Sequence, residues 1–477
     1  MPARAIVPSA TLKTRILAAL RRAVRQFLGL PMAVVAGFVA LAIVAYWADR
    51  AWSEGAVPAG FAWLGALMGD RASLGSLLST VASSIITVTS ITFSLLLVAL
   101  QQGSSALTAQ VSDQFLMRRT NQFYFGFFVG LSVYVLLTLV TVTEIHRPVF
   151  GASIALVLTT VALCLIVLMI YNTIDQMRPV KIVHAIHRHI LSARNHERRW
   201  LAQARRAPRA DTVRVATIRS RDTGRLEAVA VTRLAETLRE TAPAGCEVEL
   251  LVPVGGYVAF GDPVLALRMP GGAPVPAEDL DAISEAALAA LELDDDRTLD
   301  RDPAYGLDQL ATIAWTSTST AKSNPSPGRA VLASLRDILG RWAEPDCRLD
   351  EDAASPVIVP DTTPGAALDA LDLIIVVASE SIQAQTLADA FGTIGSLVSR
   401  VDAETGARLA DIADRALTSL GEHVPTRALM EALSTTAEAL SAAGHGAAAS
   451  RLRRATEEFG TTVGALNSRS TRVPSKT

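Results

Sequence analysis

The sequence predicts an α-helical integral membrane domain with four transmembrane helices, followed by a cytoplasmic α+β region. That region has a small β barrel-sandwich-like module and a helical C-terminal part. Three observations support this fold class: four long apolar stretches before residue 174, short β-branched segments between residues 210 and 270, and Ala- and Leu-rich helical periodicity after residue 366.

Composition limits the classes of function. Half of the 477 residues are hydrophobic and the formal net charge is −2, so charge gives no argument for a nucleic-acid partner. The three cysteines lie far apart, which predicts neither a disulfide framework nor a structural zinc site.

The first 174 residues read as a basic segment followed by the membrane domain. Residues 1–30 carry basic residues, Arg21 and Arg22 among them, and no acid. The apolar periodicity after residue 11 predicts an amphipathic helix on the cytoplasmic surface, where these arginines can meet anionic lipid headgroups. The membrane domain, 31–174, is predicted to contain spans at about 31–48, 80–102, 123–143 and 150–172.

The distribution of positive charge predicts the orientation of the spans. The N-terminus, the loop around Arg118 and the segment after Arg178 are basic, whereas the two opposite loops are not. Positive loops stay in the cytoplasm, so both ends of the chain are expected there.

The second span carries a row of hydroxyls. Its members follow one another at steps of three or four residues and therefore share one face of a helix: Ser76, Thr80, Ser83, Thr87, Ser90 and Ser94, with Gln101 in the same phase. One interpretation is helix packing, because small and hydroxyl side chains hold membrane helices together. The other is a polar path lined by several copies around an axis. Both remain open.

The third span contains Gly126 and Gly130 in a Gly-x-x-x-Gly pattern, which predicts close helix packing. Residues 175–208 read as a basic juxtamembrane helix in which Lys181 can meet anionic lipid headgroups. This helix also holds His184, His187 and His189. No carboxylate lies at a fitting spacing, so a metal site is not expected.

Residues 210–270 predict a β-rich module. The stretch PVGGYVAFGDPVLAL within it is similar to the strand–turn–strand of barrel-sandwich domains that carry biotin or lipoate. No lysine lies between Lys181 and Lys322, so the residue that such carriers modify is missing. A structural module is therefore expected, without a cofactor.

Helical patterning returns over 278–343. The aspartates around residues 294–302 lack the mid-loop glycine and terminal glutamate of a calcium loop. A polar cluster here is a candidate site, formed by Arg297, Asp302, Tyr305, Asp308 and Gln309. The favoured alternative is structural, because Asp302-Pro303 is typical of a helix start. Three further segments are predicted: a linker at 344–365, a helical region at 366–466 and a disordered tail at 467–477.

Four blocks of the sequence resemble one family. They are SSIITVTSITFSLLLVALQQGSS, RRTNQFYFGFFVG, the β stretch ending PVGGYVAFGDPVLAL, and RTLDRDPAYGLDQLATIA. In this order and spacing they are similar to the bacterial predicted membrane proteins of domain-of-unknown-function family 2254 (DUF2254). The segment that often follows the last block in the family is kept only at Asn324-Pro325. The resemblance implies membrane topology and no assigned activity.

The functional expectation is an oligomeric channel or transport-like protein of the bacterial inner membrane, with a cytoplasmic regulatory body. The alternative is a non-conducting membrane-anchored scaffold or signalling protein whose cytoplasmic domain binds a protein partner. The sequence holds no GxSxG, Walker A or HExxH motif, so no enzymatic activity, catalytic residue or metal is expected. The expected partners are the lipid bilayer and further copies of the chain.

Overall fold

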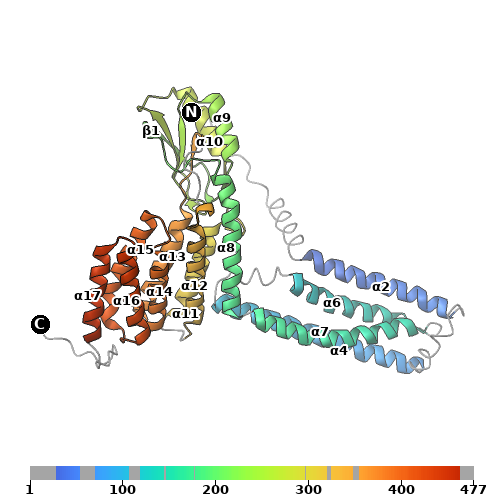
Figure 1. The fold of residues 1–477 in the computed structure, drawn as a ribbon. Helices are drawn as coiled ribbons and strands as arrows, with labels where there is room; N and C mark the ends of the chain where they lie inside the picture. The colour runs from blue at the N-terminus through green and yellow to red at the C-terminus, as the bar shows by residue number, and fades with distance from the viewer. Residues whose placement is uncertain are drawn as a thin grey trace. The chain divides into compact units, whose positions relative to one another are not determined.

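The computed structural model describes residues 28–53, 70–106, 119–143, 147–176, 178–295, 297–319, 324–347 and 354–461. Residues 1–27, with Arg21 and Arg22, and the tail after residue 461 lie outside the described part. The chain divides into two compact units, residues 1–178 and 179–477, which are described separately (Figure 1).

Unit 1 is a bundle of four long apolar helices: α2 (Gly29–Ser53), α4 (Arg71–Ala106), α6 (Arg119–Val140) and α7 (Val149–Gln176). All four are long and apolar enough to cross a membrane. Helix α6 packs against the other three and is the most buried. Phe128, Leu131 and Tyr134 on α6 are fully buried at the centre of the bundle.

The predicted second span, 80–102, lies within α4, where the stretch long and apolar enough to cross a membrane is Ala72–Leu95. The early turns contain Ser73, Ser76 and Ser79 and read as weakly apolar, but Leu74 and Leu78 on the same turns are completely buried in the bundle.

Unit 2 begins with α8 (Pro179–Leu201), followed by a β-rich part at one end of that helix (Figure 1). Its elements are β1 (Thr212–Arg219), β2 (Gly224–Val229), α9 (Val231–Thr241), β3 (Glu247–Leu250), β4 (Tyr257–Val258), β5 (Pro263–Pro270), α10 (Ala277–Ala289) and β6 (Leu291–Asp294).

The strands of unit 2 form two open sheets. One has the order β1-β5-β3-β7 and the other β4-β2-β6. Neither sheet is closed, so the barrel-sandwich expectation is not confirmed. Turns are nevertheless present within the stretch PVGGYVAFGDPVLAL, where Gly255 and Gly261 both adopt a positive φ, which glycine reaches without steric cost. Side chains of the strands, α9 and α10 share one hydrophobic core.

The remaining helices lie side by side along α8 and beyond it (Figure 1). They are α11 (Pro303–Thr318), α12 (Ser326–Trp342), α13 (Thr363–Glu380), α14 (Ala384–Leu397), α15 (Ala403–Ala416), α16 (Arg427–Ala442) and α17 (Gly446–Thr461), with 3-10 turns at Pro345–Cys347 and Leu417–Glu422.

Two predicted boundaries differ from the structure. The stretch 344–365, predicted as a linker, contains β7 (Val357–Ile358), which pairs in parallel with β3 and is almost completely buried. The predicted helical module 278–343 is divided. Helix α10 and β6 belong to the β-rich part, whereas α11 and α12 pack with α8 and α13.

Candidate functional site

The hydroxyl row of α4 faces away from its own bundle. We call Ser76, Thr80, Ser83, Thr87, Ser90 and Ser94 the hydroxyl face; all six side chains are exposed, as is Gln101. The opposite side of α4 packs into the bundle through Leu74, Leu78, Ala82 and Ile85. Within the described part of the chain, the hydroxyl face is therefore not the side through which α4 packs into its own bundle, and both interpretations of the hydroxyl row stay open.

Four hydroxyls of this face donate to backbone carbonyls of α4 itself. Thr80 Oγ1 donates to the carbonyl of Ser76 at 2.9 Å, Thr87 Oγ1 to that of Ser83 at 2.8 Å, and Ser94 Oγ to that of Ser90 at 3.1 Å. A hydroxyl that donates inward keeps its oxygen lone pairs for an outside partner. The hydroxyl face therefore presents hydrogen-bond acceptors to its surroundings.

The exposed side of α7 has a different chemistry. Its large exposed side chains are apolar along the helix, namely Leu156, Val157, Val161, Leu163, Val167, Leu168, Ile170 and Ile174. Such a surface suits lipid chains. The exposed side of α7 is therefore strongly lipophilic, whereas that of α4 carries the hydroxyl face beside exposed apolar residues such as Ile86, Ile91 and Leu97.

Gly126 and Gly130 lie against α2 within the same chain. A Cβ atom on Gly126 would sit 2.8 Å from the Cα of Pro31, and one on Gly130 would overlap the ring of Phe38. The two glycines thus allow α6 and α2 to approach closely, in keeping with the packing role of such patterns in membranes.

A carboxylate that the sequence analysis missed caps α7. Asp49, at the end of α2, is buried and accepts hydrogen bonds from the backbone N–H of Phe150 at 2.6 Å and of Gly151 at 2.9 Å. Tyr134 on α6 donates its hydroxyl to the carbonyl of Gly151 at 3.0 Å. A carboxylate at a helix N-terminus satisfies free N–H groups and suits the helix dipole. In the sequence, the indication of this cap is a single acidic residue near the end of an apolar span.

The polar cluster of unit 2 forms around Arg297. Its guanidinium donates to Asp302 Oδ2 and to Asp308 Oδ2, both at 2.6 Å, and stacks over the Tyr305 ring at 4.8 Å. Burial alone would lower the pKa of Arg297, but the two carboxylates outweigh it and the pKa is raised. The side-chain oxygen of Gln309 is buried without a hydrogen-bond partner in the described part of the chain.

The contacts of this cluster are structural and connect the start of α11 to the turn before β4. Asp302 is the N-cap of α11, accepts from the N–H of Tyr305 at 2.9 Å, and is followed by Pro303 at the first helical position. Gly255, in the turn before β4, approaches so closely that a Cβ there would overlap Asp302. Both carboxylates pair with the same guanidinium, so the contacts of the cluster are those of a helix cap and of an ion-pair network.

Buried ion pairs hold the rest of unit 2 together. Arg194 on α8 is almost fully buried; it donates to Glu197 at 2.6 Å and to both oxygens of Asp361, and it lies over the Trp342 ring. Thr363 donates to Glu197 at 2.9 Å. Burial raises the pKa of Glu197, and Arg194 opposes this shift only in part.

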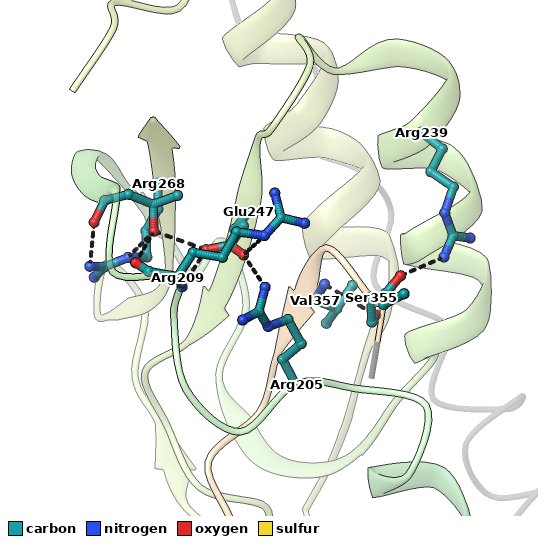
Figure 2. A network of polar contacts seen from close by, with 9 residues as sticks. Arg205, Arg209, Arg239, Glu247, Arg268, Ser355 and Val357 are labelled. Atoms are coloured by element: carbon teal, nitrogen blue, oxygen red, sulfur yellow. Dashed lines mark hydrogen bonds and ion pairs between the residues drawn. The ribbon is translucent and has the colours of Figure 1, made fainter. Parts of the chain in front are cut away.

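A second buried carboxylate lies in the four-stranded sheet (Figure 2). Glu247 on β3 is fully buried, accepts from Thr212 Oγ1 at 2.9 Å, and forms ion pairs with Arg205 at 3.1 Å and Arg209 at 3.3 Å. Nearby, Arg268 donates to Glu249 at 3.0 Å. Every buried charge here has a partner, as burial requires.

The histidines of α8 are not clustered as ligands. His187 Nε2 lies 3.1 Å from Asp337 on α12, and His189 Nδ1 lies 2.9 Å from Asp300, while His184 is exposed. Carboxylates that the sequence spacing did not reveal thus reach two of the three rings. Among the described residues, no three His, Cys, Asp or Glu side chains gather closely enough to hold a metal ion.

His187 predicts a pH dependence of stability. Burial lowers its pKa below the ordinary value of about 6.5, and Asp337 offsets this only in part. The unfolded chain therefore takes up the proton first as pH falls. The contribution of His187 to stability is fully present above about pH 6.5 and is lost as pH falls from there towards the folded pKa.

Replacing His187 with Gln is expected to flatten this part of the profile. The measurement is the Tm of full-length protein in detergent between about pH 8 and pH 5. His184→Gln, on the exposed side of α8, serves as the control and leaves the profile unchanged. Equal slopes for wild type and His187→Gln would contradict the prediction.

Comparison with known proteins identifies one family model. Residues 25–386 match the model described as "Predicted membrane protein (DUF2254)". No curated protein and no solved structure matches the chain. The matched range covers all four apolar helices, the β-rich part and the polar cluster around Arg297.

Proposed function

The chain belongs to the DUF2254 family of predicted membrane proteins, and on that premise we propose that it forms a homo-oligomeric, channel-like assembly. The hydroxyl face of α4 lines the central axis, and unit 2 is a cytoplasmic regulatory body. The membrane is the bacterial inner membrane, with both chain ends in the cytoplasm, as the basic loops favour. No enzymatic activity is part of this proposal, because Arg297, Asp302 and Asp308 serve as a helix cap and as ion-pair partners.

One observation supports this proposal above the others: the hydroxyl face is exposed on the outside of the four-helix bundle. The exposed side of α7 already offers a lipophilic surface to the bilayer. The exposed hydroxyl-rich side of α4 is better matched by water or by a second copy of the same chain.

The direction of the hydroxyl hydrogen bonds favours cations over anions as the permeating species. Thr80, Thr87 and Ser94 donate to backbone carbonyls, so their oxygen lone pairs point to the outside. An anion would need donors or positive charge on the same surface, and helix α4 carries no charged residue between Arg71 and its end at Ala106. Oxygen acceptors are the groups that replace the hydration shell of a cation.

The expected result of replacing Thr87 and Ser90 together with Leu is loss of conductance while the oligomer persists. Two apolar side chains per copy would remove acceptors at mid-span and let a narrow path lose its water. Single-channel recording in planar bilayers under a KCl gradient measures both conductance and cation preference. Val157→Leu with Val161→Leu, on the exposed side of α7, is the control with unchanged conductance. Unchanged conductance in the Thr87/Ser90 variant would exclude the pore.

The self-bonded hydroxyls also favour a second candidate. Because four of the six hydroxyls donate to carbonyls of α4 itself, the same face can pack dry against another copy without a water path. The chain would then be a non-conducting scaffold whose unit 2 binds a protein partner. In that case the Leu variant dissociates the oligomer in size-exclusion chromatography with light scattering, and the wild type shows no conductance.

A further inference from the structure

A groove in unit 2 lies over α12, α14 and α16, of which α14 packs against both of the others (Figure 1). It consists of two adjoining pockets. The first has a volume of about 360 Å³ and lies over α12 and α14, and the second has a volume of about 430 Å³ and extends to α16. Ala333 and Arg336 line both pockets. Each volume is in the range of pockets that bind small molecules.

The first pocket has an excess of positive charge. Arg336, Arg341 and Arg400 line it, against the single carboxylate of Asp337. That carboxylate is shared between two partners, because it accepts from Arg341 at 2.7 Å and lies 3.1 Å from Nε2 of His187. One acidic side chain thus faces three guanidinium groups on the walls of this pocket.

Two of these arginines retain hydrogen-bond donors for a ligand. A guanidinium has five N–H donors. In the part of the chain that the structure describes, Arg336 is exposed and forms no hydrogen bond or ion pair. Nη2 of Arg400 lies 3.4 Å from the carbonyl of Gly340 and 3.3 Å from Glu344, longer than the about 2.7–2.9 Å of a strong charge-assisted bond. Both side chains can therefore donate to an anion.

The second pocket has no charge excess. Arg329 and Asp389 in its lining pair with each other. Glu431 is exposed, and no described residue forms an ion pair or hydrogen bond with its carboxylate. Hydroxyl and amide groups continue the lining at Thr393, Thr435 and Gln385. A free carboxylate beside hydroxyl and amide groups suits a ligand with several hydroxyl groups, because each carboxylate oxygen can accept from a hydroxyl.

We propose that this groove binds a sugar phosphate. The phosphate group occupies the first pocket, where Arg336 and Arg400 donate to its oxygens, and the sugar hydroxyls lie in the second pocket and donate to Glu431. The planar guanidinium matches phosphate oxygens with two parallel hydrogen bonds. This inference does not depend on conduction along α4, and it holds equally for a channel and for a scaffold.

The first test is calorimetric titration of the full-length protein in detergent with glucose 6-phosphate, inorganic phosphate or glucose. At about pH 8 both phosphate probes are dianions. We expect saturable binding of glucose 6-phosphate, weaker binding of inorganic phosphate and no measurable binding of glucose. A wild type that binds neither phosphate probe saturably would overturn the proposal.

Variants in the first pocket test the role of its charge. Arg336→Gln should weaken the binding of both phosphate probes by roughly tenfold or more, because it removes charge-assisted hydrogen bonds. Arg453→Gln removes an exposed charge from α17, outside the groove, and should leave both affinities unchanged. Asp337→Asn should tighten both probes, a gain that a folding defect would not produce. Equal affinities for Arg336→Gln and the wild type would contradict the phosphate site.

Glu431→Gln tests the second pocket separately. It should weaken the binding of glucose 6-phosphate severalfold without weakening that of inorganic phosphate, because only the sugar reaches Glu431. Equal effects on the two probes would overturn the placement of the sugar. The Tm of each variant verifies folding, and it should match the wild type for Arg336→Gln and Glu431→Gln because both side chains are exposed and have no partner among the described residues.

Discussion

Replacing Arg194 with Met is expected to destabilise unit 2 by about 3–5 kcal/mol. Met keeps most of the length of the side chain and its contact with Trp342, but it leaves Glu197 and Asp361 as buried carboxylates without their cation. An uncompensated buried charge costs far more than a lost exposed ion pair. Urea unfolding of the full-length protein in detergent, followed by tryptophan fluorescence, measures the loss.

The pH dependence of the loss in unfolding free energy distinguishes a charge effect of the Arg194→Met substitution from a packing effect. Without Arg194, the pKa of Glu197, already raised by burial, should rise further, and protonation then relieves the repulsion from Asp361. The variant should therefore lose more stability at pH 8 than at pH 5. Arg199→Met, at an exposed position of the same helix, should cost less than about 0.5 kcal/mol. Equal losses at both arginines would contradict the buried-charge argument.

Replacing Gly126 with Val is expected to separate α6 from α2 and to lower the Tm of unit 1. The nearest atom to the new Cβ is the Cα of Pro31, 2.8 Å away, and backbone cannot rotate aside as a side chain can. Overpacking of this kind costs about 1–3 kcal/mol, and a rigid backbone neighbour places the cost near the upper end. Gly37→Val, on α2 with open space around the glycine, is the control. A similar Tm for both variants would refute a packing role for Gly126.

Local features were predictable from the sequence. The four apolar helices follow from hydropathy, and the N-cap at Asp302 follows from an acid placed directly before a proline. The second span was predicted inside α4, but the sequence did not show that its first turns bury Leu74 and Leu78 in the bundle. Periodicity put the hydroxyls on one face, but it could not show which face packs, since that depends on the neighbouring helices.

Contacts between distant residues could not be predicted. Asp49 meets the N-terminus of α7 about a hundred residues later, and Arg194 meets Asp361 more than 160 residues later. Nothing in the local sequence of these charges distinguishes them from exposed ones. The sequence identified the residues of the polar cluster. It did not show their contact with Gly255, which lies in a different block of the chain.

Strand β7 has a consequence for the synthesis of the protein. Val357 and Ile358 pair with Val248 and Glu249 of β3, so that side of β3 is completed by residues translated more than a hundred positions later. At a translation rate of about 5–20 residues per second, this edge stays open for roughly 5–20 s on the ribosome. An unpaired strand edge is a template for aggregation during that time. Nascent chains that stop before residue 357 should therefore need chaperone protection. Full-length chains should not need it, because β7 then covers the edge of β3.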